Sequence, residues 1–269
     1  MRWRRGADGS AVEDRRGQGF TPGRIGAAGG GMGLIGLLLT LLLSGGLGGG
    51  GGGPVGSTGL RPAGAPDPDA DMKDFVTFVV NDVQETWEAE FARTGRTYEP
   101  TTLVLFEQMT STGCGTGQSA SGPFYCPADR KIYLDMSFFR ELGDRFGAPG
   151  DFAQAYVIAH EFGHHIQTLL GTSDQVRQGD NEASVRLELQ ADCLAGVWGN
   201  SAFDDDLLDP GDVEEGLAAA AAIGDDRLQK QSGQRVNPES WTHGSSEQRV
   251  KWFRSGFDTG NVNDCNTFA

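Results

Sequence analysis

The segment His160-Glu161-Phe162-Gly163-His164 has the residue types and the spacing of a zinc site with its own base. Histidines four residues apart lie on one face of a helix, so both imidazoles can reach one ion. The glutamate beside the first histidine can hold a water molecule and accept its proton. Because the chain of 269 residues contains only four histidines, a chance match is improbable. The segment predicts one catalytic Zn²⁺ bound by His160 and His164, with Glu161 as general base.

A second segment offers the third ligand that such a site needs. A catalytic zinc ion usually has three protein ligands and one open position. Glu188 and Asp192 lie four residues apart within 182–198, a stretch whose composition predicts a packed helix. Glu188 is the expected third ligand, and Asp192 is expected to accept the outer N–H of a zinc-bound histidine and to fix its tautomer. The alternative, a solvated acidic helix face, fits this apolar stretch poorly.

His243 is the candidate for a catalytic donor that stabilises the carbonyl oxygen in the transition state. It precedes Ser245, which with the following Glu-Gln pair predicts a capped helix that runs to about residue 255. A lone loop histidine can equally be a packing residue, so this alternative stays open. The role of Arg249 is also open, between clamping a substrate carboxylate and supporting the surroundings of Glu161.

The elements that must position these residues form an α+β fold. The zinc helix is expected to begin after Gly150 and to end at Gly171, because apolar residues recur between them at helical spacing. His165 falls about 140° from His160 around this helix, which predicts a structural role. Further helices and strands are predicted by their periodicity and composition at 75–93 and 213–231 (helices) and at 101–106 and 131–135 (strands).

The chain resembles a known family in several stretches. These are His160 to His165, the Glu188-x-x-Ala-Asp192 element, Thr242 to Arg249, and Cys114 to Asp135. Together they are similar to the bacterial membrane-anchored neutral zinc metallopeptidases and, more distantly, to gluzincin peptidases. The resemblance implies a zincin-like metallopeptidase domain that is helix-rich with a small sheet. By analogy, the strand at 131–135 is expected to hold an extended substrate, whose identity the family leaves undefined.

The N-terminal region predicts export. Residues 1–24 contain six arginines against three acids, and no charge follows until Arg61. The expected anchor at 25–47 includes an uncharged stretch long enough for a bilayer core, which needs about 20 residues. The basic flank predicts that 1–24 is cytoplasmic and that everything after the anchor is outside. A cleavable signal peptide is the competing interpretation, and it exports the domain as well.

Two segments of different composition follow the predicted anchor. Residues 48–71 are rich in glycine and proline and predict a flexible linker, whereas 72–269 is long enough for one zinc metallopeptidase domain. Without the first 24 residues, 16 basic residues remain against 34 acidic ones, about −18 compared with −15 for the whole chain. This acidity argues against a nucleic-acid partner.

All four cysteines follow the predicted anchor, and an even number in an exported domain predicts two disulfides. We expect neighbours to pair, Cys114 with Cys126 and Cys193 with Cys265. The second bond would tie the C-terminal region to the helix that carries Glu188.

The sequence therefore predicts a membrane protein with a single N-terminal crossing and an extracytoplasmic zinc endopeptidase domain that acts on peptide or protein substrates. The alternative is a noncatalytic zinc-binding or partner-binding module with the same fold. Glu161 favours the enzyme, because a structural site needs ligands but no base. Hydrolysis of a nonpeptide amide is a third possibility, since metal and base act alike on that bond. The oligomeric state stays unknown.

Overall fold

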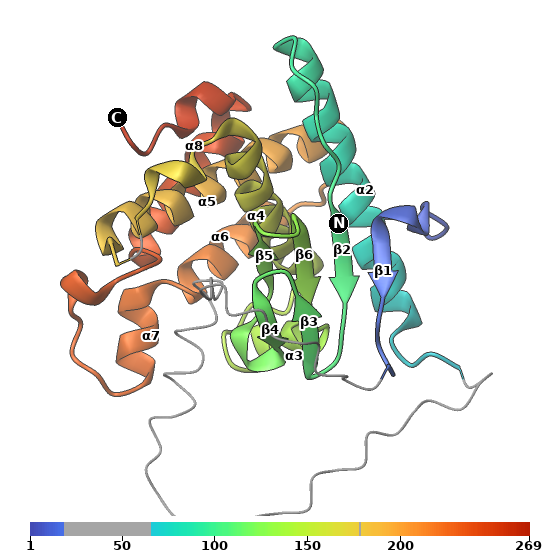
Figure 1. Cartoon of the computed structure of the whole chain (residues 1–269), viewed down its shortest axis with the longest axis horizontal. Coiled ribbons are helices and arrows are strands. Elements are labelled where there is room, and N and C mark those ends of the chain that lie inside the picture. The colour runs from blue at the N-terminus through green and yellow to red at the C-terminus, as the bar shows by residue number, and fades with distance from the viewer. Residues whose placement is uncertain (19–65, 178) are drawn as a thin grey trace, which may run out of the picture.

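The computed structural model describes residues 1–18 and 66–269, except residue 178. In these ranges a small sheet lies beside a group of helices, which confirms the predicted helix-rich α+β class (Figure 1). The strands are β1 (Val12–Asp14), β2 (Thr102–Leu105), β3 (Met109–Thr112), β4 (Gly115–Gln118), β5 (Phe124–Cys126) and β6 (Lys131–Leu134). The helices are α2 (Ala70–Arg93), α3 (Ser137–Asp144), α4 (Asp151–Leu170), α5 (Asn181–Asp204), α6 (Asp212–Ala222), α7 (Asp225–Gln231) and α8 (Ser246–Thr259).

Both predicted ends of α4 and the predicted starts of α5 and α8 are confirmed, whereas α5 and α8 run on to Asp204 and Thr259, beyond the predicted 198 and 255. Helix α4 follows Gly150 and ends at Gly171, whose φ of 76° is in the left-handed region that glycine adopts without strain. Helix α5 starts after Asp180, whose side chain accepts a hydrogen bond from the Ala183 N–H. Helix α8 starts with a capping box: the Ser245 side chain accepts a hydrogen bond from the Gln248 N–H, and the Gln248 side chain accepts one from the Ser245 N–H. These caps fix where each helix begins or ends, and therefore where its functional residues lie.

One predicted helix, 213–231, is wrong as a single element. The chain forms α6 and α7 with a break at Ile223 and Gly224. At Gly224 the chain passes so close to Ser246 that an added Cβ would lie 2.3 Å from the Ser246 nitrogen. The composition of the stretch favours helix throughout, but this close approach to the start of α8 interrupts it. The break gives α7 a separate first residue, Asp225.

The sheet has the strand order β1-β2-β6-β5. β2 is parallel to both neighbours, and β5 is antiparallel to β6. β6, the strand predicted to hold substrate, therefore lies between two partners and has no free edge. The edge strand next to the zinc helix is β5, because β5 contacts α4 more extensively than β6 does. The substrate-strand prediction for 131–135 is corrected accordingly.

The described N-terminal residues, 1–18, pack against the domain predicted for 72–269. Val12–Asp14 pairs in register with β2, and Trp3 packs edge-to-face on Phe75 at 5.6 Å between ring centroids. Arg16 is almost fully buried and bonds carboxylates on both sides of the gap, Asp14 at 2.7 Å and Asp67 at 2.6 Å. In the structure, residues 1–18 thus contact the domain from which a cytoplasmic 1–24 segment was expected to be separated by the membrane.

The predicted anchor at 25–47 and most of the predicted linker at 48–71 lie outside the described residues. Among the helices that the structure does describe, none combines the length and the apolar character needed to cross a bilayer. The anchor thus stays a prediction from sequence.

Glycines bring the site helices close together. An added Cβ at Gly163 in α4 would lie 2.9 Å from the Cα of Ala191 in α5, so the two helices meet backbone to backbone beside the ligands. Gly196 of α5 and Gly256 of α8 make similarly close contacts, with Phe253 and Cys193. Larger residues at these positions would separate the helices, so packing here determines the spacing of the site.

Both predicted disulfides are confirmed. Cys114 pairs with Cys126 near the β3–β4 hairpin, and Cys193 pairs with Cys265. The second bond joins α5 to the 3₁₀ turn Val262–Cys265. It covalently fixes the C-terminal region against the helix that carries Glu188.

Candidate metal centre

Three side chains from two helices meet at one point. His160 and His164 come from α4 and Glu188 comes from α5. His160 Nε2 lies 3.1 Å from Glu188 Oε2, and His164 Nε2 lies 3.5 Å from Glu188 Oε1. Their potential ligand atoms all lie within 4.8 Å of one another. The structure thus brings together the three residues that the sequence suggested as ligands.

These separations fit a tetrahedral zinc site. With zinc–ligand bonds of about 2.0–2.1 Å, two ligands of a tetrahedron lie about 3.3 Å apart. Both measured distances from Glu188 are close to that value. The donor set of two imidazoles and one carboxylate is one that catalytic zinc sites use, with one position left for water or substrate.

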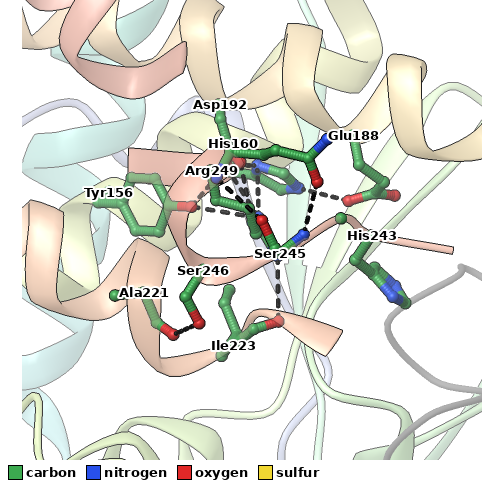
Figure 2. Close-up of polar contacts among 12 residues, drawn as sticks. Tyr156, His160, Glu188, Asp192, Ala221, Ile223, His243, Ser245, Ser246 and Arg249 are labelled. Atoms are coloured by element: carbon green, nitrogen blue, oxygen red, sulfur yellow. Dashed lines mark hydrogen bonds and ion pairs between the residues drawn. The ribbon is translucent and has the colours of Figure 1, made fainter. Parts of the chain in front are cut away.

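Asp192 contacts His160 at the ring nitrogen opposite the one that faces Glu188, in a buried network that Figure 2 shows. His160 Nδ1 is 2.9 Å from Asp192 Oδ1, which leaves Nε2 directed at Glu188. Arg249 donates to both oxygens of Asp192 at 2.8 Å, and Tyr156 Oη donates to Asp192 Oδ1 at 2.5 Å. The carboxylate is therefore fully used in orienting His160 and pairing with Arg249.

This network decides between the two options for Arg249. The side chain is completely buried, lies between Asp192 and Tyr156, and also donates to the Ile223 carbonyl at 3.4 Å. It is not free to clamp a substrate carboxylate. Arg249 instead neutralises Asp192, and removing one partner of such a buried pair typically costs about 3–5 kcal/mol.

The charges of the site shift several pKa values. Burial alone would lower the pKa of His160, but the hydrogen bond and charge of Asp192, with Glu188, raise it to about 9. Burial opposes ionisation of Glu188 as well, yet His164, His243 and His160 hold the pKa of its carboxyl well below the usual range. The site is thus built for an ionised Glu188, and a metal must displace the His160 proton, so metal affinity should fall at low pH.

Glu161 lies beside the ligands with one unused oxygen. The residue is 1% exposed, and within the described ranges its Oε1 has no hydrogen-bond partner. Burial raises the pKa of Glu161, although the nearby imidazoles of His164 and His160 lower it in part. A buried carboxylate with a free oxygen and a raised pKa is suited to accept and return a proton.

An apolar pocket opens beside Glu161 and His243. Its walls come from the loop before β5, from α3 and the residues after it, from α4, from the α6–α7 junction and α7, and from α8 with the loop before it. The apolar side chains that line it are Pro123, Phe138, Phe146, Val157, Ile223 and Leu228. Its volume is about 20 Å³, which is room for about one water molecule next to the base.

His243 is held by a residue that sequence reasoning missed. Asp225, the first residue of α7, accepts backbone N–H bonds from Thr242, His243 and Gly244 at 2.7–3.1 Å. Its other oxygen lies 3.3 Å from His243 Nδ1, and the Thr242 hydroxyl lies 3.0 Å from the same nitrogen. His243 Nε2 is buried and has no partner among the described residues. With Nδ1 engaged, Nε2 is the nitrogen left for a ligand in the pocket.

The other two histidines, His164 and His165, are each held by a polar group outside the ligand set. His164 Nδ1 lies 2.9 Å from Gln167 Oε1, and Gln167 Nε2 donates to Gln190 Oε1 at 3.1 Å. His165 faces away from the ligands, with Nε2 donating to the Glu99 carbonyl at 2.7 Å, as its position on the helix suggested. Gln167 follows His164 by three residues on the same helix, and this spacing was the one signal in the sequence that could have revealed it.

Comparisons with known proteins place nearly the whole chain in one family. A family model described as "Putative neutral zinc metallopeptidase" matches residues 1–268. The chain is 46% identical over 288 aligned positions to "Uncharacterized protein YpfJ" of Escherichia coli (strain K12), covering 100% of this chain and 99% of that relative. It is 48% identical over 182 positions to "Uncharacterized protein Rv2575" of Mycobacterium tuberculosis (strain ATCC 25618 / H37Rv), covering 62% of each. No solved structure matches the chain.

Proposed function

Because the chain belongs to the neutral zinc metallopeptidase family, we propose that it is a zinc-dependent endopeptidase with a zincin-like site. The observation that carries the proposal is the juxtaposition of His160, His164 and Glu188 at tetrahedral spacing with a buried glutamate beside them. Zinc held by these side chains would lower the pKa of a water molecule toward neutrality and polarise a substrate carbonyl.

Glu161 supplies the proton transfers. Its free Oε1 accepts the proton of the attacking water, and the raised pKa of its carboxyl lets it hold that proton until the amine leaves. A noncatalytic zinc module would have no use for such a group, because burying a carboxylate without a full set of partners is costly. The partnerless oxygen therefore favours the enzyme over the binding module.

His243 Nε2 is the second group that faces the reaction. It has no partner of its own, and it lines the same pocket as Glu161. A protonated Nε2 would donate to the carbonyl oxygen as negative charge develops there. Asp225 acts through His243 by fixing the loop, and we regard it as a positioning residue.

The substrate is proposed to be an extended peptide or an unfolded protein segment. The free edge of β5 offers backbone groups for such a chain, and a peptide that adds to a sheet edge gains main-chain hydrogen bonds. Nonpeptide amides remain a test substrate class.

The reaction is proposed to occur outside the cytoplasm, which the two disulfides support. A single membrane crossing between a cytoplasmic 1–24 and the domain is not part of this proposal, because β1 pairs with β2. Nucleic acid is not an expected partner of a chain with a net charge of −15.

The test uses the full chain, with zinc analysis and digestion of casein and a peptide library. Glu161→Gln should keep about one zinc per chain and lose turnover, whereas Glu188→Ala should lose zinc. Glu182→Ala, an exposed glutamate on the same helix, is the matched control and should behave like the parent. If Glu161→Gln cleaves as fast as the parent, the proposed base is wrong.

A further inference from the structure

A second cavity lies behind the zinc helix and shares no lining residue with the catalytic pocket. It has a volume of about 380 Å³ and lies between the C-terminal half of α2, the end of α4, α5 and the 3₁₀ turn Val262–Cys265. Sites for small ligands usually measure about 300–1,000 Å³ and combine apolar walls with a few polar groups. The size of the cavity therefore suits a ligand rather than a few waters.

The wall of the cavity mixes apolar and polar side chains and contains one unsatisfied donor. Its large apolar side chains are Trp87, Phe91, Ile166, Leu170, Leu194, Val262 and Phe268. Trp87 is 1% exposed, and its Nε1 has no hydrogen-bond partner within the described ranges. A buried donor without an acceptor is unfavourable, so a ligand that carries an acceptor into the cavity would satisfy a group that the protein leaves open.

Two arginines also line the cavity. Arg93 pairs with Glu90, which lines it too, at 2.7 Å. Arg96 is an exposed residue at the rim, lies over the Phe91 ring at 5.9 Å, and has no carboxylate partner in the part of the chain that the structure describes. The lining therefore has one positive charge in excess, although the whole chain is strongly acidic. An anionic group with an apolar body complements this lining.

The cavity is connected to a zinc ligand by hydrogen bonds. Gln190 lines the cavity and donates from Nε2 to the Cys265 carbonyl at 3.0 Å. Its Oε1 accepts from Gln167 at 3.1 Å, and Gln167 Oε1 lies 2.9 Å from His164 Nδ1. A ligand that displaces Gln190 would therefore change the partner that orients His164.

We propose that this cavity is a second ligand site for an apolar carboxylate, with Trp87 and Arg96 as its polar contacts and with Gln190 linking it to His164. The carboxylate can come from the apolar C-terminal residue of a peptide or from a fatty acid. The inference does not depend on peptidase activity, because binding is measured directly.

The experiment is calorimetric titration of the zinc-loaded full chain with N-acetylphenylalanine, its amide, and decanoate. At about 0.3 kcal/mol per non-hydrogen atom, N-acetylphenylalanine should bind with a Kd of roughly 0.5 mM. Tighter binding of N-acetylphenylalanine or of decanoate assigns the source as peptide or fatty acid, and either supports the proposal. No binding of either acid up to 5 mM, or equal binding of the amide, overturns it.

Variants locate the site. Arg96→Gln and Trp87→Phe should each weaken binding about tenfold, because each loses a hydrogen bond to a charged group. Arg140→Gln, which changes an exposed arginine outside the cavity, and Glu161→Gln should bind like the parent. Unchanged binding in Arg96→Gln and Trp87→Phe overturns the proposed contacts.

The link to His164 has its own readout. Saturation with the acid should change the rate of zinc removal by a chelator at least about twofold, by reciprocal coupling of the two sites. Gln190→Met should bind the acid and abolish that change. A removal rate that is identical with and without the acid refutes the connection, whereas the peptidase proposal is judged by turnover alone.

Discussion

Replacing Asp225 by alanine tests how the loop that carries His243 is held. The carboxylate accepts three backbone N–H groups, from Thr242, His243 and Gly244, and lies 3.3 Å from His243 Nδ1. Hydrogen bonds to a charged group contribute about 1.5–3 kcal/mol each, and water entering the space left by the side chain recovers part of this. We expect a loss of about 3–5 kcal/mol in unfolding free energy, which a domain of ordinary stability survives.

The effect on catalysis should match the loss of His243. Removal of one oxyanion donor typically lowers kcat by about 10²–10³. Asp225→Ala should approach that loss in kcat with a smaller change in KM, because the released loop no longer fixes Nε2 in the pocket. The variant should keep its zinc, since no contact joins Asp225 to a zinc ligand. The double variant with His243→Ala should be no slower than His243→Ala alone.

The assay is steady-state cleavage of a fluorogenic peptide selected from the library, with zinc content and urea unfolding measured in parallel. Asp226→Ala is the matched control. Asp226 also accepts two hydrogen bonds at 2.8 Å, from the N–H and hydroxyl of Ser246, but does not contact His243. It should lose stability and keep kcat within about threefold. The reasoning is refuted if Asp225→Ala is as active as Asp226→Ala, or if the double variant loses a further 10²-fold.

Three other predictions concern packing and charge. Gly163→Ala places a methyl group 2.9 Å from the Cα of Ala191, so both the unfolding free energy (by about 1–3 kcal/mol) and the zinc affinity should fall. Unchanged zinc affinity in a chelator competition would contradict this. The carboxyl of Asp82, which accepts a hydrogen bond from Trp198, is buried, and burial raises its pKa from 3.8 to about 6. Because the folded state holds this proton more tightly than the unfolded state, the unfolding free energy should fall as the pH rises from about 4 to 6. Asp82→Asn should therefore be about 1–3 kcal/mol more stable than the parent at pH 8 and equal to it near pH 4, in urea unfolding of metal-free protein. Arg16→Ala removes the guanidinium that joins Asp14 to Asp67, while Asp14 keeps its ion pair with Lys73, so the unfolding free energy should fall by about 1.5–3 kcal/mol. An unchanged melting temperature would show that β1 does not need this contact.

The candidate ligands could be predicted from sequence because their geometry is local. His160 and His164 share a helix face by spacing alone, and Glu188 lies in a helix whose polar residues need a buried partner. Asp225 could not be found in this way. It is 18 residues from His243, and it reaches the loop only because the chain breaks at Gly224 against Ser246. A break that depends on a close approach between distant segments leaves no periodic signal in the stretch 213–231.

The pairing of the N-terminal residues with the domain could not be predicted for a related reason. Six arginines before an apolar stretch are the usual mark of a cytoplasmic flank, and the charge pattern carries no information about strand pairing. The three residues of β1 are too few to show alternation, and their partner β2 begins about 90 residues later. Yet four of the six arginines bond residues beyond 65 in the structure. These pairs are Arg2 with Asp209, Arg5 with Asp71, Arg15 with Thr110, and Arg16 with Asp67. Since the family model also starts at residue 1, a membrane role for 25–47 must be compatible with both flanks of that segment folding into one domain.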